Sequence, residues 1–116
     1  MKRLWQATIN SWHGLVAIAR SEQAFREELV LLVIGIPLAC VFTGNAGMRF
    51  VLIGSLVFVM IVELLNTALE KLSDRLTRDR DPAIKDVKDM GSAAILLSLL
   101  LAGALWIWAA VAWLRS

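Results

Sequence analysis

Four polar side chains recur at helical spacing in the segment IVELLNTALEKLSDRL, which directly follows a strongly apolar run. They are Glu63, Asn66, Glu70 and Asp74. At about 100° per residue, these side chains fall within a narrow arc of one helix. Ionisable groups at membrane depth are costly and usually face the interior of a helical bundle. The arc is therefore a candidate functional site; the alternative is a polar clamp that fixes helix packing.

Two glutamates about two helical turns apart need a compensating partner, which can be a cation, a proton or a basic side chain. Mg²⁺ prefers oxygen ligands and is typically held by one or two carboxylates together with substrate phosphates. Glu22, which precedes the first apolar run, is expected at a depth similar to that of Glu70. These two carboxylates could hold one Mg²⁺, whereas the deeper Glu63 would meet a group that arrives from the lipid.

Lys88 and Asp89 stand at the start of the last apolar run, at the same expected level as Glu70. A lysine at this level is a suitable partner for phosphate. The pattern predicts phosphate and metal on the water side and an apolar acceptor on the lipid side. The chain has neither GxxxxGK[ST] nor GxGxxG, so any use of ATP would be unconventional.

These side chains must be positioned by membrane helices. The chain has 116 residues, of which 59% are hydrophobic, and no charged residue lies in 29–47 or 90–114. Soluble domains typically contain about 45–50% apolar residues. We predict one all-α membrane domain over 1–116, with transmembrane helices at 29–43, 48–76 and 90–114. The polar segment 77–88, in which Pro82 breaks the helix, is predicted to be a loop.

An amphipathic helix is predicted over residues 2–20, because Trp5, Ile9, Trp12 and Val16 recur at helical spacing. Such a helix lies in the membrane interface. Most charges just before a span are solvated at the headgroup level, and the charged residues there are Glu22, Arg26, Glu27 and Glu28. Near the other end of the chain, an outer aromatic belt is expected from Trp106, Trp108 and Trp113.

The net charge is +2, and the basic residues cluster beside the spans. This distribution indicates membrane topology rather than nucleic-acid binding. The positive-inside rule places the N-terminus and the 71–89 loop in the cytoplasm, with the 43–47 loop and the C-terminus outside.

The segments EQAFREE, VMIVELLNTALEKLSDR and KDMGSAA together resemble the prokaryotic diacylglycerol kinase family, in order and spacing, over nearly the whole chain. The resemblance implies a homotrimer in the bacterial inner membrane that phosphorylates diacylglycerol to phosphatidic acid with MgATP. The segment KDMGSAA resembles the diacylglycerol kinase branch more than the related undecaprenol kinases.

The resemblance also implies roles for individual residues. Glu63 matches the general base, and Glu22 and Glu70 match the Mg²⁺ ligands. The nucleotide contacts that it implies are Arg3, Asn10, Glu22, Glu70, Asp79, Arg80, Asp81, Lys88 and Asp89. The lipid contacts that it implies are Trp12, Arg26, Glu63, Asn66 and Ser92.

Three other functions remain open at this point. An undecaprenol kinase would keep the chemistry and change the acceptor. A small transporter or channel would use the intramembrane glutamates to carry protons or cations. A structural subunit would use the polar arc only to hold helices together.

Overall fold

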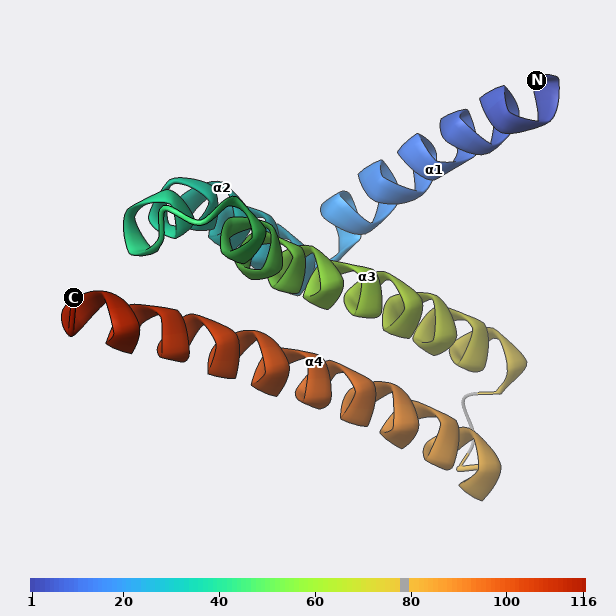
Figure 1. The fold of residues 1–116 in the computed structure, drawn as a ribbon. Coiled ribbons are helices and arrows are strands. Elements are labelled where there is room, and N and C mark those ends of the chain that lie inside the picture. The colour runs from blue at the N-terminus through green and yellow to red at the C-terminus, as the bar shows by residue number, and fades with distance from the viewer. Residues whose placement is uncertain (78–79) are drawn as a thin grey trace.

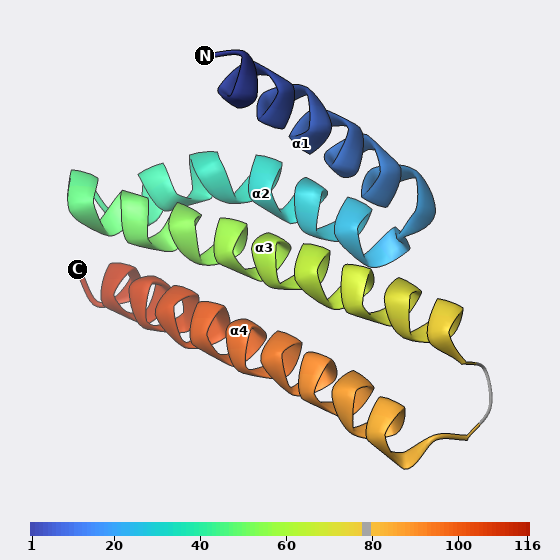
Figure 2. The same cartoon turned by 90° about the vertical axis from the view of Figure 1, so that its right-hand side faces the viewer.

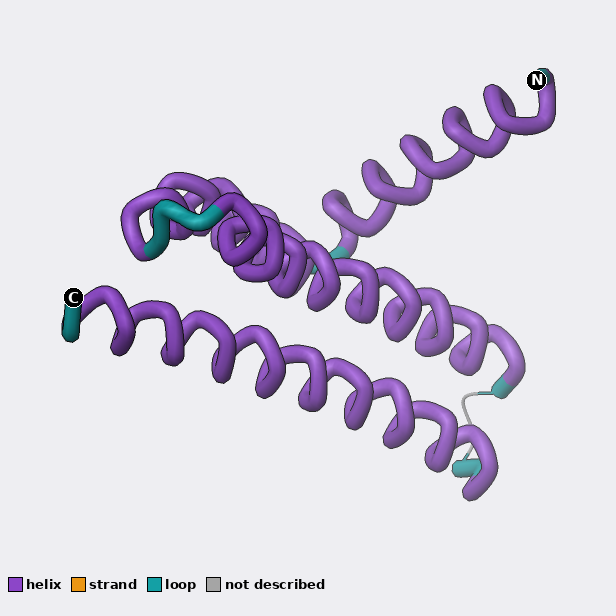
Figure 3. Tube along the Cα trace, in the orientation of Figure 1, coloured by secondary structure: helices purple, strands orange, loops and turns teal. Residues whose placement is uncertain are grey.

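The structure is a computed structural model that describes residues 1–77 and 80–116. These residues form four α-helices with short connections, and none of them lies in a strand (Figure 3). The helices are α1 (Lys2–Ser21), α2 (Gln23–Phe42), α3 (Ala46–Leu76) and α4 (Pro82–Leu114). The predicted all-α architecture is confirmed for the described part of the chain.

Helix α3 is central to the arrangement. It packs against both α4 and α2, whereas α1 contacts chiefly α2. Figures 1 and 2 both show α3 and α4 side by side and antiparallel. Helix α1 projects away from the other three helices, and the N-terminus lies at its far end (Figure 1).

Helix α4 begins well before the predicted third span. The Oδ1 atom of Asp81 accepts hydrogen bonds from the backbone N–H groups of Ala83 (2.9 Å) and Ile84 (3.4 Å). Pro82 occupies the start of the helix, where a missing N–H costs nothing. The prediction of a loop over 77–88 is therefore wrong from Pro82 onward, because proline here starts a helix.

Two arginines bind the end of the helix that precedes their own. Arg26 on α2 donates from Nη1 to the carbonyl oxygens of Ala19 (2.8 Å) and Arg20 (3.1 Å), at the end of α1. Arg49 on α3 donates from Nε to the carbonyl oxygen of Thr43 (2.8 Å), the C-cap of α2. The last carbonyls of a helix lack intrahelical partners, so these contacts satisfy them and fix both inter-helix connections.

Two small apolar clusters join the helices. The first contains Ile18, Phe25 and Met60, from α1, α2 and α3. The second contains residues of α2, α3 and α4, namely Ala39, Leu52 and Ala109. Because α3 contributes to both clusters, it fixes the polar arc relative to every other helix.

Trp106 is an interhelical residue rather than only part of an aromatic belt. Its Nε1 atom donates to the carbonyl oxygen of Leu52 (3.1 Å) and to Oγ of Ser55 (3.1 Å) on α3. Trp106 is partly buried, whereas Trp108 is 62% exposed. Burial of an indole favours a hydrogen-bond partner for its N–H, which α3 supplies here.

Two of the described helices, α3 and α4, are long and apolar enough to cross a membrane, each with a mean hydropathy of 2.3 in its most apolar stretch. Helix α2 carries Arg26, Glu27 and Glu28 near its start, and its uncharged part runs only from Leu29 to Phe42. At about 1.5 Å per residue, that part is shorter than a hydrocarbon core of about 30 Å. Many large apolar side chains on α2, α3 and α4 are exposed in the single chain, as in an all-α membrane protein.

Candidate active site

The polar arc on α3 is buried at one end and exposed at the other. Glu63, Asn66 and Thr67 are 8%, 8% and 7% exposed, respectively, whereas Glu70 and Asp74 are exposed. The hydroxyl of Thr67 donates to Oε1 of Glu63 at 3.5 Å, a long hydrogen bond. The arc therefore leads from solvent to a carboxyl group inside the helical bundle.

Carboxylates from other parts of the chain interact electrostatically with Glu63. The charges of Glu22 and Glu70 both repel a charge on Glu63. Glu63 in turn repels Glu28 on α2. The structure thus places both Glu22 and Glu70 within electrostatic range of Glu63. The sequence had linked Glu70 to Glu63 by helical spacing and Glu22 to Glu70 only by expected depth.

The connection between α1 and α2 holds Glu22 beside α3. Glu22 is the single residue between the two helices, and its extended backbone redirects the chain. The Nζ atom of Lys71 on α3 donates to Oγ of Ser21 at 3.2 Å. The end of α1 is therefore attached to the same turn of α3 that carries Glu70.

A polar pocket of about 950 Å³ lies where α3 ends and α4 begins. Three basic side chains line it, from the connection and from the first turns of α4: Arg80, Lys85 and Lys88. Asp74 and Asp81 also line it, and Asp81 caps α4 there. Clustered cationic groups at a helix N-terminus favour a ligand with several negative charges, such as a polyphosphate.

The two lysines that line this pocket both form ion pairs. Nζ of Lys88 lies 2.6 Å from Oδ1 of Asp74, and Nζ of Lys85 lies 2.7 Å from Oδ2 of Asp89. The hydrogen bond with Asp74 raises the pKa of Lys88, and that with Asp89 raises the pKa of Lys85. Both lysines therefore stay charged and can exchange their carboxylates for phosphate oxygens.

The described residues contain no group of three or more His, Cys, Asp or Glu side chains placed to hold a metal ion by themselves. Glu22 and Glu70 are two carboxylates that each lie close enough to Glu63 to act on its charge. Mg²⁺ fits such a donor set, since it commonly takes one or two carboxylates and completes its shell with water and phosphate.

The residues predicted on α1 do not reach this cluster within the single chain. Arg3, Asn10 and Trp12 are exposed along a helix that projects away from α3 and α4 (Figure 1). Asn10 accepts a hydrogen bond from Gln6 within the same helix, at 3.2 Å. The predicted nucleotide contact Asp79 lies outside the described residues.

Two predicted lipid contacts lie on different helices. Arg26 binds the last carbonyls of α1, and Ser92 is exposed on α4, next to the buried Gly91. Neither position was tied to Glu63 by sequence spacing.

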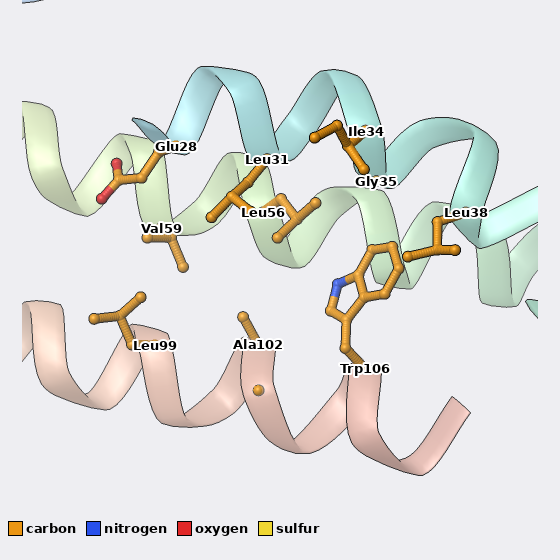
Figure 4. A pocket seen from close by; sticks show the side chains of 11 residues that line it. Glu28, Leu31, Ile34, Gly35, Leu38, Leu56, Val59, Leu99, Ala102 and Trp106 are labelled. Carbon is orange, nitrogen blue, oxygen red and sulfur yellow. The ribbon is translucent and has the colours of Figure 1, made fainter. Parts of the chain in front are cut away.

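An apolar pocket of about 320 Å³ runs between α2, α3 and α4 (Figure 4). Glu28 lies at one end of it and Trp106 toward the other, with aliphatic side chains such as Leu31, Leu56 and Leu99 between them. Oε1 of Glu28 is buried and has no hydrogen-bond partner among the described residues. Glu28 is therefore an exception to the expectation that most charges before the first span are solvated at the headgroup level.

The comparison with known families decides which proteins share this arrangement. The family model described as prokaryotic diacylglycerol kinase matches residues 9–110. The chain belongs to this family. Diacylglycerol kinase from Pseudomonas aeruginosa (strain PAO1) is 40% identical over 106 residues, which are 91% of this chain and 86% of that protein. Diacylglycerol kinase from Escherichia coli (strain K12) is 39% identical over 104 residues, 90% and 85% of the two chains.

The resemblance stated from the motifs is thus confirmed at the level of the prokaryotic diacylglycerol kinase family. A third relative, diacylglycerol kinase from Haemophilus influenzae, is 36% identical over 91% of this chain and 90% of its own length. The family match covers both the polar arc of α3 and the adjacent residues Lys88 and Asp89 of α4, so these parts of the candidate site lie within the shared region.

Sequence reasoning missed two residues that the structure places at the site, Lys85 and Gly91, and one pairing. Asp74 was part of the polar arc and Lys88 was a predicted nucleotide contact, but the ion pair between them was not predicted. Lys85 carried a visible signal, since it stands four residues before Asp89 on one helix face. Gly91 gave only the weak signal of a small residue, and its role depends on the neighbouring helix.

Proposed function

We propose that this chain transfers the γ-phosphoryl group of ATP to the primary hydroxyl of diacylglycerol, giving phosphatidic acid and ADP. The observation that carries the proposal is the position of Glu63. Its side chain is buried on a helix apolar enough to cross a membrane, and two other carboxylates act on it. The names of the relatives favour diacylglycerol over undecaprenol as the acceptor.

Glu63 is proposed as the general base. In the reaction, the bond between the γ-phosphorus and the β–γ bridging oxygen breaks, and a new bond forms to the oxygen of the lipid hydroxyl. The proton of that hydroxyl passes to the carboxylate of Glu63. The buried setting of Glu63 suits this role, because an apolar acceptor that enters sideways from the inner leaflet can reach it.

The polar pocket is proposed as the nucleotide site. Phosphoryl transfer depends chiefly on positioning and on neutralising charge, and Lys88 and Arg80 supply positive charge there. Asp81 and Asp89 border the same region, and Asp79, Arg3 and Asn10 are further proposed contacts. Glu22 and Glu70 would hold the Mg²⁺, which neutralises charge on the β- and γ-phosphates when bound.

The lipid is proposed to contact Glu63, Asn66 and Ser92, together with Trp12 on the surface helix and Arg26 at the start of α2. Exposed Trp5 and Trp12 on α1 support an interfacial position for this helix, because tryptophan is enriched at membrane–water boundaries. The hydroxyl of diacylglycerol would then lie at the height where α1 meets α2.

We further propose that α2 is a third transmembrane helix and that the active form is a homotrimer in the bacterial inner membrane. The exposed apolar faces of α2, α3 and α4 support both, since they need lipid or further copies against them. The basic residues of the α3–α4 connection support its cytoplasmic location, together with the N-terminus, and an external C-terminus.

The test uses purified protein in mixed micelles with diacylglycerol and labelled MgATP. We expect labelled phosphatidic acid, and we expect Glu63→Gln to lower turnover by about 10²–10⁴-fold while MgATP binding stays nearly intact. The matched control is Glu27→Gln, since Glu27 is an exposed glutamate whose Oε1 accepts a hydrogen bond from Gln23 on its own helix. The control should keep wild-type turnover.

Near-normal turnover in Glu63→Gln would remove Glu63 as the base. If undecaprenol is labelled and diacylglycerol is not, undecaprenol is the acceptor in place of diacylglycerol. If neither lipid is labelled, proton or cation flux into liposomes without ATP would favour a transporter instead.

A further inference from the structure

Asn66 on α3 and Gly91 on α4 share one small space. A Cβ atom added to Gly91 would overlap Oδ1 of Asn66 and lie 3.2 Å from its Cγ. The Asn66 side chain therefore occupies the volume that any side chain at position 91 would need. A glycine at this point allows the amide to pack directly against the backbone of α4.

The amide at this contact is buried and only partly satisfied. Asn66 is 8% exposed, and its Oδ1 atom is buried with no hydrogen-bond partner among the described residues. A buried acceptor without a donor is unfavourable, and such atoms persist where packing or a ligand requires them. The packing against Gly91 supplies a reason for the amide to remain here.

The contact connects the two parts of the proposed site, which are the carboxylates of α3 and the phosphate-binding groups of α4. On α3, Asn66 stands one helical turn from Glu63 and one from Glu70. On α4, Gly91 follows Asp89 by two positions and Lys88 by three. A displacement at this contact would therefore change the position of the carboxylates relative to the phosphate-binding groups.

We propose that Gly91 is a positioning residue for the phosphoryl transfer. Because position 91 has no side chain, the Asn66 amide fits between α3 and α4. The packed amide in turn fixes the position of Glu63 relative to Lys88. This inference rests on the proposed function, but the docking of Asn66 against Gly91 can be tested without any activity. Gly91 acts only through Asn66 and does not itself contact the reactants.

Gly103 on α4 provides a matched control. A Cβ atom at Gly103 would meet nothing within 4 Å in the described structure. Alanine is the better helix former at both positions, so propensity alone would favour either substitution. The two variants therefore differ in whether the new methyl group overlaps with the Asn66 side chain.

The kinetic test compares Gly91→Ala, Gly103→Ala, Asn66→Ala and the double variant with alanine at 66 and 91. We expect Gly91→Ala to lower kcat about tenfold or more with little change in the KM for MgATP, because the reacting groups are misplaced. Gly103→Ala should stay within about twofold of wild type. In the Asn66→Ala background, Gly91→Ala should change kcat by less than about twofold, since the displaced atom is gone.

A spectroscopic readout tests the contact directly. The chain has three asparagines, Asn10, Asn45 and Asn66, so protein labelled with ¹⁵N in the asparagine side-chain amide gives three pairs of N–H signals, one pair for each residue. Gly91→Ala should shift the Asn66 signals and leave those of Asn10 and Asn45 in place, whereas Gly103→Ala should shift none.

Unchanged Asn66 signals in Gly91→Ala would overturn the proposed contact, whatever the kinetics show. Shifted signals with a kcat within twofold of wild type would overturn the positioning role. A wild-type protein without kinase activity would overturn the proposed function instead, and the amide signals would still decide whether Gly91 holds Asn66.

Discussion

Lys88 on α4 and Asp74 on α3 are joined by a 2.6 Å hydrogen bond beside the polar pocket. Their side chains are 39% and 55% exposed, so the pair is screened by solvent. Ion pairs that are this exposed contribute little to stability. Lys88 can therefore leave Asp74 for a phosphate oxygen at little cost.

Removal of the Asp74 charge should favour nucleotide binding. Asp74→Asn deletes a competitor for Lys88 and a negative charge near the phosphates, so we expect the KM for MgATP to fall about 2–5-fold. Lys88→Met should raise that KM about tenfold or more, since it removes a charged hydrogen-bond donor to the phosphates. Steady-state kinetics at saturating diacylglycerol measures both values, with Asp86→Asn as the exposed control.

A rise in KM for Asp74→Asn similar to that for Lys88→Met would mean that the intact ion pair is what binds nucleotide. In that case Asp74 would be a positioning partner of Lys88 rather than a competitor.

Loss of the Glu70 carboxylate should weaken the use of Mg²⁺. We expect Glu70→Gln to raise the Mg²⁺ concentration for half-maximal turnover about tenfold or more, because a charged ligand contact is worth about 1.5–3 kcal/mol. A Mg²⁺ titration at fixed ATP measures this, and Glu27→Gln should give the wild-type curve. An unchanged titration for Glu70→Gln would count against its role as a ligand.

Arg26 connects the orientation of α1 to the rest of the molecule. Arg26→Met removes the hydrogen bonds to the carbonyls of Ala19 and Arg20, so α1 should become mobile relative to α2. We expect faster proteolysis between α1 and α2 and a KM for MgATP raised about 3–10-fold, in line with the loss of hydrogen bonds from a charged group. Limited proteolysis and kinetics on the same preparation provide the measurement.

The control for Arg26 is Arg20→Met, which removes a nearby positive charge and leaves the Arg26 contacts to the backbone in place. If both variants raise KM equally, the charge near the connection matters and the orientation of α1 does not.

Trp106 should contribute to stability without affecting substrate affinity. Trp106→Phe removes the donor to Leu52 and Ser55, and we expect the free energy of unfolding to fall by about 1–2 kcal/mol with both KM values unchanged. Thermal inactivation in detergent compares it with Trp108→Phe, whose parent side chain is 62% exposed. Equal losses in the two variants would show that the Trp106 hydrogen bonds do not stabilise the packing of α3 and α4.

The sequence by itself determined the helices, the polar arc and the family. Helical periodicity is a local property, so the spacing of Glu63, Asn66 and Glu70 was enough to place them on one face of α3. The motifs around them were enough to identify the prokaryotic diacylglycerol kinase family. Proline at the start of α4 misled the prediction of a loop, because proline both ends helices and begins them.

Only the tertiary structure decided which polar groups meet. The partners Lys88 and Asp74, and the contact of Asn66 with Gly91, lie on different helices, and their meeting depends on helix packing. Glu28 shows the same limit. Its position before an apolar run suggests solvent, yet the packing of α2 against α3 and α4 places one of its oxygens in an apolar pocket. Periodicity fixes the face of a helix, but the neighbour of that face is set by long-range packing.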